Sequence, residues 1–175
     1  MTATMSPLES RLFATARLIA RELGVCLPVK VCVIDGNPVD ATHIAQMLRY
    51  SRGPGMPTYV VDVQTESDKA EAMLLKQEHD VYIIDINLDG TSGLELVASI
   101  QARGIHFPFI VLTGSEQHDR PAMSYDCMAY IHKPVTPENL RTAVDYAIKN
   151  FKTRCTKDMC MEILSAAPGK PSSAV

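Results

Sequence analysis

The sequence predicts an α/β fold, in which helices cover both faces of a parallel β-sheet. Segments with strand and helix patterns alternate five times between residues 29 and 151. Residues 81–85 form an apolar and partly β-branched run, which is typical of a central strand buried on both faces. This run ends at Asp85, and because an isolated charge is costly to bury, we expect Asp85 at the exposed carboxyl end of the strand.

The length and composition favour one globular domain with appended segments. A chain of 175 residues with 46% hydrophobic content supports one sizeable core and is cramped for two. We expect the domain at residues 29–151, an N-terminal amphipathic helix extension at residues 1–28, and a C-terminal helical extension with a disordered tail at residues 152–175.

The first elements are predicted from periodicity and helix signals. Residues 8–23 carry apolar side chains every three or four positions, and the pattern stops at Gly24, so they predict an amphipathic helix ahead of the domain. The first strand, residues 29–34, is followed by Asn37, which favours a helix N-cap, and by Pro38, which favours a first helical turn. We therefore predict a helix from Pro38 to about residue 50.

The later elements continue the same alternation. A loop at residues 51–57 contains two glycines and two prolines, which favour turns. The remaining predicted strands are residues 58–63, 81–85, 107–112 and 128–132, and the remaining predicted helices are residues 68–78, capped by Thr65 or Ser67, 94–103, 119–127 and 138–151. Between the third strand and the next helix, Asp89, Gly90 and Thr91 predict a tight turn.

The alternation predicts a flavodoxin-like, doubly wound sheet of five parallel strands in the order 2-1-3-4-5. Four of these strands end at a polar residue, and these residues are Asp35, Asp85, Thr113 and Lys133. Because the carboxyl ends of parallel strands lie at one edge of the sheet, we expect the four side chains to meet in one crevice.

Such a crevice suits phosphoryl chemistry. Two converging carboxylates repel each other unless a cation lies between them, and oxygen ligands suit Mg²⁺. With the metal present, Asp85 can act as a nucleophile that forms an acyl phosphate. Lys133 and the Thr113 hydroxyl can bind phosphoryl oxygens, Gly114 leaves room for the group, and Asn87 can offer its backbone carbonyl to the metal.

Four stretches together resemble the receiver domain of two-component response regulators. They are Asp35 before Asn37-Pro38, the Ile-Ile-Asp-Ile-Asn-Leu run at residues 83–88 with Gly93 after it, Val-Leu-Thr-Gly at residues 111–114, and Tyr-Ile-His-Lys-Pro at residues 130–134. The resemblance covers about residues 29–151. It implies phosphorylation of Asp85, Mg²⁺ bound by Asp35, Asp85 and Asn87, and a signalling protein that is not an enzyme.

The resemblance also implies a switch and a set of partners. Thr113 and Lys133 respond to the phosphoryl group, Tyr130 swings inward when Thr113 moves, and a cis peptide bond precedes Pro134. The phosphoryl donor is a histidine kinase or a phosphotransfer protein. The output is contact with a downstream protein through the fourth helix, fifth strand and fifth helix.

One position departs from the family pattern. Receivers usually carry two adjacent acids after the first strand, and here Gly36 takes the place of the second. The loss of a ligand carboxylate is expected to weaken Mg²⁺ binding. An alternative function is therefore a degenerate pseudo-receiver, which acts as an interaction module without phosphorylation.

An enzyme is the third hypothesis. The Asn-Leu-Asp-Gly-Thr run at residues 87–91 resembles the first motif of haloacid dehalogenase phosphatases, whose nucleophile is an aspartate. Asn87 takes the nucleophile position and cannot attack phosphorus as a carboxylate does, and no late acidic pair supports a metal. This hypothesis is the least favoured.

The candidate site residues also have ordinary interpretations. Asp35 can cap a helix, although Asn37 already fits that role, and Lys133 can be a solvated loop lysine. Thr113 can be a turn hydroxyl, and Tyr130 can be a core aromatic. The five histidines are scattered without the spacing of metal ligands.

Composition excludes several other classes of protein. The net charge of −3, with both signs interspersed, argues against direct nucleic-acid binding. No apolar run is long enough for a membrane span, and the start lacks a secretory signal, so we expect a cytoplasmic protein. Five cysteines without Cys-x-x-Cys spacing argue against a disulfide framework and a zinc site.

The last helix has an apolar stripe that extends beyond the domain. Its members, at steps of three or four residues, are Val144, Ala147, Phe151, Cys155, Met159 and Ile163. The stripe favours one long helix over a short separate helix on the domain. We expect this helix to pack with the helix at residues 8–23 or across a homodimer.

Overall fold

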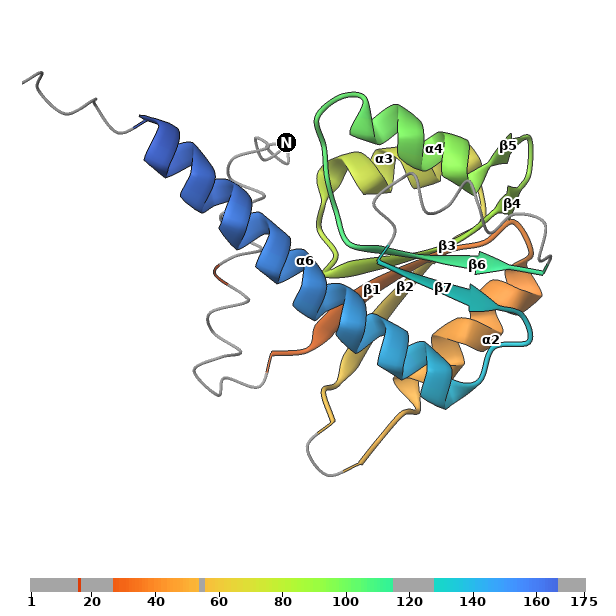
Figure 1. Ribbon diagram of the computed structural model, residues 1–175. Coiled ribbons are helices and arrows are strands. Elements are labelled where there is room, and N and C mark those ends of the chain that lie inside the picture. Colours follow the sequence, from red (N-terminus) through yellow and green to blue (C-terminus); the bar gives the residue numbers. More distant parts are fainter. Residues whose placement is uncertain (1–15, 17–26, 54–55, 115–127, 167–175) are drawn as a thin grey trace, which may run out of the picture.

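A computed structural model describes residues 16, 27–53, 56–114 and 128–166, with residues 152–166 described as backbone alone (Figure 1). Apart from residue 16, the helix predicted at residues 8–23 lies outside the described residues, as do the helix predicted at residues 119–127 and the tail predicted to be disordered. Within the described part, no helix is long and apolar enough to cross a membrane.

Five parallel strands form the sheet, in the order β2-β1-β3-β6-β7. They are β1 (Val29–Ile34), β2 (Tyr59–Gln64), β3 (Val81–Asp85), β6 (Phe109–Thr113) and β7 (Ala129–His132). Numbered along the chain among the strands of this sheet, the order is 2-1-3-4-5. The predicted fold class and strand order are therefore confirmed.

Helices cover both faces of this sheet, as Figure 1 shows. The described helices are α2 (Pro38–Arg49), α3 (Ser67–Lys76), α4 (Gly93–Gln101) and α6 (Pro137–Ala166). Helices α2 and α6 pack on one face, and α3 and α4 pack on the other. The arrangement is that of a doubly wound α/β fold.

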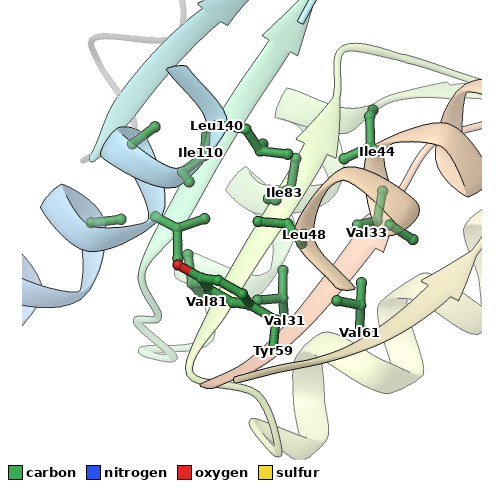
Figure 2. Close-up of a cluster of buried hydrophobic side chains, with 14 of the residues drawn as sticks. Val31, Val33, Ile44, Leu48, Tyr59, Val61, Val81, Ile83, Ile110 and Leu140 are labelled. Carbon is green, nitrogen blue, oxygen red and sulfur yellow. The ribbon is translucent and has the colours of Figure 1, made fainter. Parts of the chain in front are cut away.

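The two faces of the sheet hold separate hydrophobic clusters, because successive side chains of a strand point to opposite sides. In β1, Val31 and Val33 join the cluster under α2 and α6, whereas Cys32 and Ile34 join the cluster under α3 and α4. Figure 2 shows the first cluster, in which Leu140 of α6 lies with strand residues. β3 is buried along its whole length, so the prediction of a central strand is confirmed.

The predicted N-cap residue is confirmed for α2 and wrong for α3. The Asn37 side chain accepts a hydrogen bond from the Val39 N–H, and Pro38 is the first residue of α2. The prediction that Thr65 or Ser67 caps α3 is wrong, because the N-cap is Glu66 and its side chain makes no cap hydrogen bond. Instead, Oε1 of Gln64 accepts from the Thr65 and Glu66 N–H groups.

A small hairpin connects β3 to α4. It pairs β4 (Asn87–Leu88) with β5 (Thr91–Ser92) in antiparallel fashion, and Gly90 has a φ of 81° at its turn. The predicted turn is therefore present, although the antiparallel pairing of β4 with β5 on either side of it was not predicted. Ser92 and Glu95 then form a capping box that starts α4.

Helix α6 is continuous from Pro137 to Ala166 and projects beyond the sheet (Figure 1). The Thr136 hydroxyl accepts a hydrogen bond from the Asn139 N–H at its start. The interpretation as one long helix is thus confirmed, and the alternative of a short separate helix is wrong. Its contact with the N-terminal segment or with a second copy stays a prediction.

Candidate functional site

The carboxyl edge of the sheet brings three of the predicted site residues together. Asp35 follows β1, Asp85 ends β3 and Lys133 follows β7. Backbone hydrogen bonds hold these strand ends in register, from Asp35 N–H to the Gln64 carbonyl and from Lys133 N–H to the Thr113 carbonyl. The residues are 50 and 48 positions apart along the chain, and strand pairing alone makes them neighbours.

The Lys133 ammonium is the centre of the site. Its Nζ donates to Asp35 Oδ2 at 2.9 Å, to Asp85 Oδ2 at 2.9 Å and to Asp40 Oδ2 at 3.1 Å. Only 22% of the Lys133 side chain is exposed, and the side chains of Asp35 and Asp85 are 0% and 7% exposed. The interpretation of Lys133 as a solvated loop lysine is therefore wrong.

Asp40 was not among the predicted site residues. It lies in the first turn of α2, and its side chain is 44% exposed. A signal for it was present in the sequence, since Asn37 and Pro38 fix where α2 begins. Helical side chains lean toward the helix N-terminus, so an acid in the first turn of this helix leans back toward Asp35.

Burial and hydrogen bonds between charged groups shift the pKa values of Asp35 and Lys133. Burial raises the pKa of the Asp35 carboxyl above its ordinary value, although the hydrogen bonds from Lys133 and from the Asn37 N–H oppose this shift. Partial burial alone lowers the pKa of Lys133, but its hydrogen bonds to Asp85 and Asp35 outweigh that effect and raise the pKa. Lys133 is accordingly a charged ammonium at neutral pH.

Asp35 also shows how the turn after β1 is built. Its Oδ1 accepts from the Asn37 N–H, whereas Asn37 itself caps α2. The interpretation of Asp35 as the helix cap is therefore wrong. Its other oxygen, Oδ2, points to Lys133.

The two carboxylate oxygens of Asp85 differ in their hydrogen bonding. Oδ2 binds Lys133, whereas Oδ1 is buried and has no hydrogen-bond partner among the described residues. A buried acceptor without a partner is costly, so this atom favours a site that receives a further cation or donor.

The hairpin after β3 borders the same pocket. A Cβ atom added to Gly36 lies 3.4 Å from the Asn87 carbonyl oxygen and 3.1 Å from the Asp89 backbone nitrogen. The Asn87 carbonyl oxygen therefore lies next to the turn that follows Asp35. No group of three or more His, Cys, Asp or Glu side chains in the described part of the chain is arranged to hold a metal.

The other predicted site residues lie in or just after β6 and β7. Thr113 is fully buried at the end of β6, one residue beyond Leu112, which pairs with Asp85. Gly114 follows it and is exposed, and a Cβ there meets no described atom within 4 Å. Tyr130 of β7 packs against the cluster under α3 and α4, and its ring centroid is 5.3 Å from that of His132.

The peptide bond between Lys133 and Pro134 is cis, as the resemblance implied.

Comparison with protein families gives one match over most of the chain. A family model described as "Response regulator receiver domain" matches residues 31–145. Among curated proteins, the two-component response regulator PhoP of Pseudomonas aeruginosa is 28% identical over 123 residues, which are 69% of this chain and 52% of PhoP. The transcriptional regulatory protein PdtaR of Mycobacterium tuberculosis is 27% identical over 130 residues, which are 72% of this chain and 60% of PdtaR. The matches thus span only about half of these relatives.

Solved structures show the same fold. A response regulator receiver domain protein from Clostridium thermocellum is 26% identical, with 71% of this chain and 98% of that chain covered at a TM-score of 0.61. A CheY-like receiver domain protein from Methanospirillum hungatei is 19% identical, with 73% and 99% covered at a TM-score of 0.62, and supports the fold alone.

Proposed function

The chain belongs to the response regulator receiver domain family of two-component signal transduction, and from this premise we propose that it accepts a phosphoryl group on Asp85. Receiver domains are signalling modules and are generally not enzymes. The observation that carries the proposal is the state of Asp85, which is buried, binds Lys133 through Oδ2 and has an unpartnered Oδ1.

The proposed reaction uses the Asp85 carboxylate as the nucleophile. One of its oxygens forms a bond to phosphorus while the bond from phosphorus to the donor, a histidine nitrogen in a kinase or phosphotransfer protein, breaks. The electron pair of that bond leaves with the imidazole of the donor, which picks up a proton from water. Lys133, already 2.9 Å from Asp85 Oδ2, is placed to bind an oxygen of the incoming group.

The residues present fit a hard divalent cation. Asp35, Asp85 and the Asn87 carbonyl supply oxygen donors, and the unpartnered Asp85 Oδ1 is the atom that most needs a cation. When bound, Mg²⁺ supplies positive charge that offsets the charge of the phosphoryl oxygens. Asp35 holds its place through the Asn37 N–H, which leaves Oδ2 as its donor on the pocket side.

The remaining residues have roles in the response to phosphorylation. Thr113 donates its hydroxyl to a phosphoryl oxygen, Gly114 leaves space, and Tyr130 changes its position as Thr113 moves. The signal then passes to a downstream protein by contact with the surface of β7 and α6. This part of the proposal rests on family membership and on the positions of these residues at the edge of the sheet.

A pseudo-receiver is the second candidate, and two observations favour it. Gly36 lacks the second acidic side chain, and the described residues contain no three-ligand metal group. In this case Lys133 stays bound to its carboxylates, and the chain acts as an interaction module without phosphorylation.

One experiment separates these functions. The chain is incubated with acetyl phosphate and Mg²⁺, and intact-mass spectrometry measures the mass gain of one phosphoryl group. Asp85→Asn is the test variant, and Asp62→Asn is the matched control, because Asp62 is an exposed acid that contacts His79 instead of Lys133. We expect the adduct on the wild type and on Asp62→Asn, and none on Asp85→Asn.

Other outcomes have clear meanings. No adduct on the wild type supports the pseudo-receiver, and an adduct that persists in Asp85→Asn contradicts the assignment of Asp85. Continuous release of phosphate over many turnovers supports the phosphatase hypothesis instead.

A further inference from the structure

The site contains a third carboxylate that the family pattern does not supply. Asp40 approaches Lys133 from the first turn of α2, while Gly36, where family members usually carry an acid, has no side chain. We propose that Asp40 replaces the missing acid of Gly36 and completes the negative charge with which the pocket binds a divalent cation. This inference rests on the proposed function and deepens it.

The first argument is the convergence of the carboxylates. Oδ2 atoms of Asp35, Asp40 and Asp85 all lie between 2.9 and 3.1 Å from one nitrogen atom, Lys133 Nζ. The three acids therefore contact the same ammonium nitrogen, which brings Asp40 next to the two carboxylates that are proposed to bind the cation. Three carboxylates facing one ammonium leave an excess of two negative charges, which a divalent ion offsets.

A second observation points to a ligand independently of the acidic cluster. The Asp85 side chain is 7% exposed, and its Oδ1 is buried without a hydrogen-bond partner among the described residues. If Lys133 satisfied every carboxylate oxygen, the pocket would need no further hydrogen-bond donor or cation. Here the buried acceptor Asp85 Oδ1 is left without a partner among the described residues.

The space around Gly36 leaves little room for an acidic side chain at this position. A Cβ at this position lies 3.1 to 3.4 Å from backbone atoms of Asn87, Leu88 and Asp89, which is tighter than an ordinary contact. An acidic side chain there requires the β4–β5 hairpin to shift by a few tenths of an ångström. Asp40 avoids this obstacle because it reaches Lys133 from the first turn of α2.

Asp40 acts on the cation through charge and water. Its side chain is 44% exposed, so it has access to solvent, and Mg²⁺ keeps several of its waters when it binds to proteins. A water of the ion is the natural link to an acid at this position. For a divalent cation and a carboxylate in a solvated pocket, we expect a change of about fivefold in affinity.

The test is the dissociation constant of Mg²⁺, measured by isothermal titration calorimetry on the full chain without any phosphoryl donor. The variants are Asp40→Asn, Asp40→Glu and, as a control acid outside the pocket, Asp62→Asn. We expect Asp40→Asn to raise the Kd about fivefold, Asp40→Glu to recover most of the affinity, and Asp62→Asn to match the wild type.

Folding is checked separately, by thermal unfolding of each variant without Mg²⁺. Asp40 is partly exposed in a first helical turn, so its substitution by Asn is expected to be tolerated. Asp40→Ser repeats the test with a side chain that also suits a first turn.

The outcomes distinguish this inference from the proposed function. An Asp40→Asn variant with the Kd of the wild type overturns the inference, and so does a wild type that binds no Mg²⁺. If Asp40→Asn weakens binding but Asp85 is never phosphorylated, the inference stands and the proposed function fails. If Asp85 is phosphorylated but the Kd for Mg²⁺ is unchanged in Asp40→Asn, the proposed function stands and this inference fails.

Discussion

Replacement of Gly93 by alanine tests how the structure positions Asp85. Gly93 is the first residue of α4 and is buried against the end of β3. A Cβ atom at Gly93 lies 2.1 Å from the Asp85 carbonyl oxygen and 2.8 Å from Cγ2 of Ile84. The Gly93 N–H also donates to the Ile86 carbonyl at 2.8 Å. The helix start and the strand end are therefore fixed against each other at this point.

The size of the effect follows from these distances. Since an ordinary contact begins near 3.4 Å, the alanine methyl requires a separation of more than ~1 Å between α4 and β3. The shortest contact is with the backbone carbonyl of Asp85, which cannot relax by a change of rotamer. We expect a loss of about 3 kcal/mol of unfolding free energy, which is the upper part of the usual range for overpacking.

Urea unfolding followed by circular dichroism measures this loss. With the slope expected for a domain of this size, the midpoint falls by about 1.5 M. Gly114→Ala is the control, because a methyl group there meets no described atom within 4 Å and its stability is expected to match the wild type. A Gly93→Ala midpoint within about 0.3 M of the wild type would refute the reasoning.

Two further predictions concern the pocket and the start of α4. Because burial raises the folded-state pKa of Asp35, the stability linked to this carboxyl is complete below its unfolded-state pKa and is lost as pH rises through the folded-state value. Asp35→Asn is therefore expected to be more stable than the wild type at neutral pH and to match it in acid. Urea titrations at several pH values measure this difference, and a less stable variant at neutral pH contradicts it. Ser92→Ala removes the capping box with Glu95 and is expected to cost about 1 kcal/mol in the same assay, so an unchanged midpoint would contradict that role.

The alternation of strands and helices was predictable because it depends on local patterns. The all-apolar run of β3 and the Asn37-Pro38 helix start each depend on a few neighbouring residues. The failure at α3 has a local cause of a different kind. Glu66 takes the N-cap position without a side-chain cap bond, and Gln64, at the end of β2, accepts from the Thr65 and Glu66 N–H groups just before the helix. Hydrogen bonds from the next two N–H groups to a long side chain such as Gln64 have no recognisable sequence signal, so they could not be predicted.

The sequence by itself determined the strand order, the burial of β3 and the presence of Asp35, Asp85 and Lys133 at one edge of the sheet. These follow from periodicity and from the rule that parallel strands end together. Only the tertiary structure decided that Asp40 joins Lys133 and that the hairpin after β3 crowds Gly36. The physical reason is that both contacts join separate elements, and their distances depend on how α2 and the hairpin pack against the sheet.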